Sequence, residues 1–181
     1  MNPETLHYLN LFLGLGAILL QIISVIALLM LFFGIRNVFL DFLKQHFLSL
    51  SFIVVLFATL LSLFYSLVIG FLPCYLCWYQ RIFMFPLVFL YGVALRYKDK
   101  TVIKYAFPLA TIGFLFAIYQ NFFYYFSESS SLPCDASGVS CYQRLISEFG
   151  GYISFPMFSL TVFFAILVLI SVAHFYKKEI I

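Results

Sequence analysis

Two cysteines separated by two residues carry the clearest chemical signal in this sequence. Cys74 and Cys77 follow Pro73 and stand where a long apolar segment begins. Residues i and i+3 share one face of a helix, so the two thiols can approach each other. The free N–H groups and the dipole at a helix N-terminus favour a thiolate. Arg81 follows Cys77 by one helical turn, where its charge can support a thiolate or a docked anion. The spacing therefore predicts a redox-active dithiol.

An inert structural disulfide is the alternative interpretation of this pair. A disulfide across one turn of helix closes a very small loop, which adds little stability. The redox role is therefore favoured.

A second pair of cysteines lies later in the chain, at Cys134 and Cys141. Asp135, Ser137 and Gly138 make the segment between them turn-prone, so this pair is expected in a polar loop rather than on a helix face. Such a loop can exchange its disulfide with a soluble protein, but loops are also stapled by inert disulfides. Four cysteines could also form a zinc site.

The composition decides which kind of protein holds these cysteines. The chain has 181 residues, of which 65% are hydrophobic and only 9% are charged. A soluble domain of this size could not bury so much apolar surface. A net charge of +3, with no basic face, excludes a nucleic-acid partner. We therefore expect residues 1–181 to form a single domain of an all-α integral membrane protein.

Five apolar segments are long enough to cross a bilayer, which needs about 20 residues. Helices are expected because lipid offers the backbone no hydrogen-bond partners. Basic residues do not precede the first segment, and it is too long for a signal peptide, so we expect it to be retained. The segments cover residues 6–34, 47–72, 78–95, 105–126 and 155–175.

The basic residues predict the orientation, because they concentrate in cytoplasmic loops. Eight of the ten follow the first, third or fifth apolar segment, which predicts an outer N-terminus and a cytoplasmic C-terminus. Both cysteine pairs would then face outward, where bacterial proteins keep disulfides. This compartment argues against zinc, and we expect no metal. The eight residues are Arg36, Lys44, Arg96, Lys98, Lys100, Lys104, Lys177 and Lys178.

The two outward-facing dithiols beside a membrane are expected to react with different partners. A soluble protein can reach the loop pair, and a lipid-soluble oxidant such as a quinone can reach the helix pair. Residues 127–154 form the predicted outer redox loop, with a short amphipathic helix at about 142–149 lying on the membrane. Gln120 and Asn121 are polar within the fourth apolar segment, where such residues hold helices together or contact a quinone.

The segment Pro73–Pro86, with the sequence PCYLCWYQRIFMFP, resembles the DsbB/BdbC family of quinone-linked disulfide oxidoreductases. Leu132-Pro-Cys134 and the segment Gly151–Leu160 are also similar to that family. The resemblance covers residues 47–176 and implies a DsbB-like four-helix core. It also implies a bacterial inner-membrane enzyme that reoxidises a periplasmic DsbA-like thioredoxin-fold protein and reduces ubiquinone or menaquinone.

The resemblance also implies roles for individual residues. Cys74 and Cys77 would form the quinone-facing pair, with the Cys77 thiolate next to the quinone and Arg81 supporting its ring. Trp78 can flank the ring or belong to an aromatic belt. Cys134 and Cys141 would face the partner, and Cys134 would form the mixed disulfide.

The sequence departs from the family pattern in two places, and two other functions compete. The helix at 6–34 is additional to the four-helix core, and Gln80 stands where the family often has an acid. A VKOR-like quinone or epoxide reductase shares the bundle, but its CxxC usually follows the loop pair. A non-enzymatic membrane scaffold would hold inert disulfides that mild thiols leave intact.

Overall fold

The computed structural model describes residues 3–126 and 151–176, and this part of the chain is helical without strands. Five helices are long and apolar enough to cross a membrane, which confirms the predicted all-α membrane fold and its five spans. The elements are α1 (Pro3–Phe32), α2 (Val38–Gln45), α3 (Phe47–Leu67), α4 (Tyr75–Tyr97), the 3₁₀ helix η1 (Lys100–Val102), α5 (Ile103–Phe126) and α6 (Phe155–Phe175).

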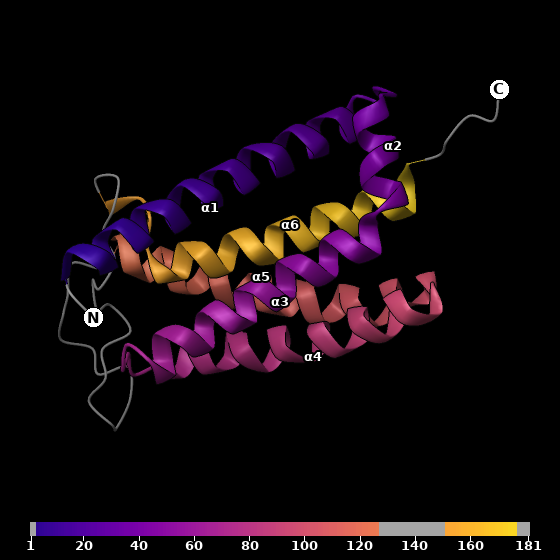
Figure 1. Ribbon diagram of the computed structural model, residues 1–181. Helices are drawn as coiled ribbons and strands as arrows, with labels where there is room; N and C mark the ends of the chain where they lie inside the picture. The colour runs from indigo at the N-terminus through magenta and orange to yellow at the C-terminus, as the bar shows by residue number, and fades with distance from the viewer. Residues whose placement is uncertain (1–2, 127–150, 177–181) are drawn as a thin grey trace.

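Helices α3, α4, α5 and α6 form a four-helix bundle in which each helix packs against the next and α6 returns to α3. Helix α1 is an addition to this bundle and packs along the outside of α6 (Figure 1). The bundle interior is filled by fully buried apolar side chains, among them Leu87, Tyr91, Phe163 and Ile166. The extra N-terminal helix therefore adds a fifth span on the outside of the bundle, and its Ala27 joins the buried apolar cluster.

Helices α5 and α6 approach closely because Gly113 has no side chain. The ring of Phe163 occupies the space beside it, and a Cβ atom at Gly113 would lie 2.3 Å from Phe163 Cε1. Small residues allow this kind of close helix packing in membranes, where van der Waals contact drives association.

Helix α2 was not predicted from the sequence, because eight residues are too few to form a span. Leu40 and Leu43 are buried on one of its faces, while Val38 and Phe42 are exposed. Its Lys44 ammonium donates to the backbone carbonyl of Tyr176 at the end of α6. The amphipathic helix that we did predict, at about 142–149, lies outside the described residues.

The two ends of the molecule differ in their chemistry. Helices α1, α4 and α6 begin, and α3 and α5 end, at one end, which we call the cysteine end because Cys74 is the N-cap residue of α4 (Figure 1). Ser154 caps α6 at the same end, where its Oγ accepts a hydrogen bond from the backbone N–H of Met157. Cys134 and Cys141 lie between α5 and α6 in the sequence, outside the described residues.

Candidate functional site

The two cysteines of the CxxC motif meet at the start of α4, as their spacing predicted. Cys74 is the N-cap residue and is buried, while Cys77 lies in the first turn and is partly exposed. Their Sγ atoms are 3.1 Å apart, within hydrogen-bond distance of each other. A small movement of either side chain would bring the sulfurs to bonding distance, so the pair can interconvert between dithiol and disulfide.

A side-chain amide from α5 lies beside both sulfur atoms. Gln120 Nε2 is 3.6 Å from Cys74 Sγ and 3.6 Å from Cys77 Sγ. The Gln120 carbonyl oxygen in turn accepts a hydrogen bond of 2.7 Å from Gln80 Nε2 of α4. Both glutamine side chains are buried, so the donor is fixed in place and can stabilise negative charge on sulfur.

Arg81 is a buried cation held by the backbone and side chain of one residue on α3. Its Nε donates to Ser62 Oγ and its Nη2 to the Ser62 carbonyl, each at 2.9 Å. Its guanidinium carbon lies 5.2 Å from the centre of the Trp78 ring, which is a cation–π distance. No carboxylate pairs with it among residues 3–126 and 151–176, so its charge remains available to a thiolate or to a ligand.

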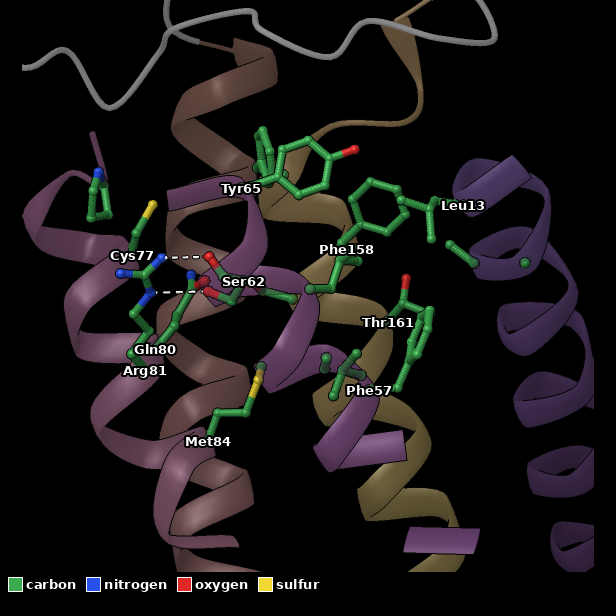
Figure 2. A pocket seen from close by; sticks show the side chains of 18 of the residues that line it. Leu13, Phe57, Ser62, Tyr65, Cys77, Gln80, Arg81, Met84, Phe158 and Thr161 are labelled. Carbon is green, nitrogen blue, oxygen red and sulfur yellow. Dashed lines mark hydrogen bonds between the residues drawn. The ribbon is translucent and has the colours of Figure 1, made fainter. Parts of the chain in front are cut away.

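Cys77 and Arg81 line a common cavity of about 260 Å³. Figure 2 shows Cys77, Gln80 and Arg81 of α4 at one side of this cavity and Leu13 of α1 at the other. Its polar part combines these α4 residues with Ser62 and Gln120, and most of the remaining wall is apolar. The cavity therefore suits an amphipathic molecule with a polar, redox-active head and an apolar body.

Cys74 and Trp78, the other predicted site residues that the structure describes, do not line this cavity. Trp78 is 53% exposed, and its ring contacts the Arg81 guanidinium from outside the cavity wall. Cys134 and Cys141 lie outside the described residues. Within the part of the chain that the structure describes, no cluster of three His, Cys, Asp or Glu side chains could hold a metal ion.

Two residues of the site were not assigned to it from the sequence. Ser62 is one of several serines in an apolar helix, and nothing in the local sequence marks it as the partner of Arg81. The polar side chain of Gln120 within an apolar span is a signal in the sequence. Its contact with the cysteines, however, can be predicted only if α4 and α5 are known to be neighbours.

Comparison with known sequences places the chain among disulfide bond formation proteins. A family model described as "DsbB: Disulfide bond formation protein DsbB" matches residues 44–173. The chain is 36% identical over 136 residues to a "Probable disulfide formation protein C 2" of Bacillus anthracis, covering 75% of this chain and 96% of that protein.

Two further relatives give the same picture. The "Disulfide bond formation protein C" of Bacillus subtilis is 38% identical over 138 residues, covering 74% of this chain and 96% of the relative. A "Probable disulfide formation protein" of Chlamydia muridarum is 41% identical over 125 residues, covering 68% and 89%. No solved structure matches the chain.

Proposed function

Since this chain belongs to the DsbB family and is a multi-pass membrane disulfide oxidoreductase, we propose a complete electron route for it. The electron donor is a DsbA-like thioredoxin-fold protein outside the bacterial cytoplasmic membrane. The electron acceptor is a membrane quinone, either ubiquinone or menaquinone. The net result is the formation of disulfide bonds in secreted proteins.

The observation that carries this proposal is that Cys77 and the buried Arg81 line the same cavity. A quinone, when bound there, supplies an acceptor for two electrons and two protons. The guanidinium of Arg81, held by Ser62, would bind a quinone oxygen and stabilise negative charge on it. The apolar walls would accept the ring face and the prenyl chain. The donor set and the polarity of the cavity therefore fit this class of molecule.

The route consists of two disulfide exchanges and one oxidation. A partner thiolate attacks Cys134 of the Cys134–Cys141 disulfide, and the partner leaves with a disulfide while the loop pair becomes a dithiol. This dithiol then reduces the Cys74–Cys77 disulfide and is itself reoxidised. Finally, the Cys74–Cys77 dithiol would be oxidised back to its disulfide, and its two electrons and two protons would pass from the side of Cys77, which lines the cavity, to the quinone held there.

Quinone reduction by the purified protein tests the proposal. The donor is a reduced thioredoxin-fold protein, and the acceptors are a soluble ubiquinone analogue and a soluble naphthoquinone, each followed by absorbance. We expect wild type to reduce a quinone and both Cys77→Ser and Cys141→Ser to be inactive. A reduced partner whose second cysteine is replaced by serine should form a mixed disulfide with Cys134 of the wild-type chain, visible as a larger band on a non-reducing gel, and Cys141→Ser, which has no Cys134–Cys141 disulfide to attack, should not form it.

The variant Arg81→Met tests the cavity separately from the cysteines. Loss of a charge-assisted hydrogen bond costs about 1.5–3 kcal/mol, so kcat/KM for quinone should fall about 10- to 100-fold. Oxidation of the partner in a single turnover should be unchanged, since it needs only the cysteines. A wild-type protein that is inert with both quinones, and whose disulfides resist mild thiols, would instead support the non-enzymatic scaffold.

A further inference from the structure

Helix α1 lines the cavity although it lies outside the part of the chain that the family shares. The family model begins at residue 44, after α1 and within the last turn of α2. The alignment with the Bacillus anthracis relative covers 96% of that protein but only 75% of this chain, so the unmatched quarter belongs to this chain. The residues of α1 that line the cavity are Phe12, Leu13, Gly16, Ala17 and Leu20.

These α1 residues form one continuous face. Their spacing follows the helical period, so they project on the same side of α1 over two turns. They lie across the cavity from Cys77 and Arg81, as the position of Leu13 in Figure 2 shows. Without α1, the cavity would be open on this side, between α3 and α6.

Hydrogen bonds fix α1 on both sides of the lining segment. Before it, Tyr65 of α3 donates its hydroxyl hydrogen to the side-chain oxygen of Asn10. After it, Gln21 Nε2 donates to Thr161 Oγ1 of α6 at 2.6 Å, and Gln21 Oε1 accepts from the Tyr152 hydroxyl at 2.9 Å. Polar contacts between apolar helices set their register and rotation. Leu13 and Ala17 of the lining face are accordingly buried, while Phe12, which also lines the cavity, is 73% exposed.

Gly16 leaves open space in the middle of this face. A Cβ atom at this position would meet no atom within 4 Å. Glycine is a poor helix former, and the regular helical backbone at this position does not require a glycine. The missing side chain leaves room in the cavity at the point where α1 faces it.

We propose that α1 is the outer wall of the quinone pocket and that its Leu13, Gly16 and Leu20 face contacts the bound quinone beyond its head group. The inference rests on the proposed quinone reduction and adds a specificity-determining helix to it. Gly16 sets the width of the pocket where the ring substituents and the first isoprene units pass. Larger side chains at this position should therefore exclude quinone without affecting the cysteines.

A graded series at Gly16 tests the inference: Gly16→Ala, Gly16→Val and Gly16→Leu. The control is Leu19→Phe, which adds similar bulk to α1 at an exposed position outside the cavity lining. Two quantities are measured. One is KM for a prenylated ubiquinone analogue. The other is the midpoint of saturable quenching of Trp78, the single tryptophan, by the same quinone.

We expect KM and the quenching midpoint to rise with side-chain size, by about tenfold for Gly16→Leu. The reason is that about two methylene groups of the quinone lose their buried contacts. Oxidation of the thioredoxin-fold partner in a single turnover and the values for Leu19→Phe should match wild type. If Gly16→Leu does not fold, Gly16→Val decides by the same criteria.

If KM and the quenching midpoint stay unchanged across the series while wild type is active, α1 does not form a wall of the quinone pocket. The proposed quinone reduction would then still stand. Failure of wild type to reduce or bind any quinone would instead remove the proposed function itself.

Discussion

At the scale of single residues, Gln120 is the contact that joins the dithiol to the rest of the bundle. Its amide N–H groups face both sulfur atoms, and Gln80 holds its carbonyl oxygen from the other side. A hydrogen bond to a charged group is worth about 1.5–3 kcal/mol. Because the side chains are buried, water does not replace this donor when it is removed. Gln120 should therefore matter for sulfur reactivity rather than for folding.

The variant Gln120→Leu tests this contact. In a chain with Cys134→Ser and Cys141→Ser, the reduced Cys74–Cys77 pair should react with iodoacetamide about tenfold more slowly at fixed pH, since the thiolate loses a donor. The matched control is Thr111→Val on the same helix, whose hydroxyl donates to the backbone carbonyl of Phe107. Equal alkylation rates in Gln120→Leu and wild type, with equal unfolding midpoints, would show that the amide does not act on the sulfurs.

The sequence was sufficient to predict those parts of the site that lie within one helical turn or two. The CxxC pair, its place at a helix start and the position of Arg81 one turn later follow from local spacing, and the structure has all three. The partners Ser62 and Gln120 come from other helices, 19 and 43 residues away from the residues they contact. No local pattern specifies which helices are neighbours, so these contacts could not be predicted.

At the scale of helices, hydropathy predicted the spans but not all of their ends. The second apolar segment continues to Leu72, whereas α3 stops at Leu67, because Gly70 adopts a positive φ of 81° and Pro73 cannot continue the helix. The third segment was expected from Trp78, but α4 begins at Tyr75 and includes the first turn around Cys77. Turn residues therefore set the ends that average hydrophobicity cannot locate.

The close approach of α5 and α6 gives a prediction for stability. Gly113→Ala places a methyl group where the Phe163 ring now lies, and such overpacking costs about 1–3 kcal/mol. The midpoint of thermal unfolding in detergent should therefore fall. Gly16→Ala is the matched control, because its methyl group enters open space and alanine is the better helix former, so its midpoint should stay or rise.

A second substitution separates overpacking from other causes. If the Phe163 ring is the obstacle, Phe163→Leu should cost less stability in the Gly113→Ala background than in wild type, since the smaller side chain makes room for the methyl group. Purely additive losses would contradict the steric explanation.

At the scale of the whole molecule, charge separates the two ends. The basic residues of the described segments, apart from Arg81, lie beyond α1 or around η1, at the end opposite to the cysteines (Figure 1). They are Arg36, Lys44, Arg96, Lys98, Lys100 and Lys104. Positive charge of this kind remains in the cytoplasm during membrane insertion. The cysteine end would then face the oxidising compartment that disulfide chemistry requires.

Labelling from outside the cell tests this orientation. In a chain whose four cysteines are replaced by serine, Glu4→Cys places one thiol at the cysteine end and Lys100→Cys places one at the basic end, both at exposed positions. A membrane-impermeant maleimide should label Glu4→Cys in intact cells and Lys100→Cys only after permeabilisation. Both should label equally once the membrane is opened, which controls for reactivity. The reverse pattern would place the cysteine end in the reducing cytoplasm, where its disulfides would not persist and the proposed electron route could not operate.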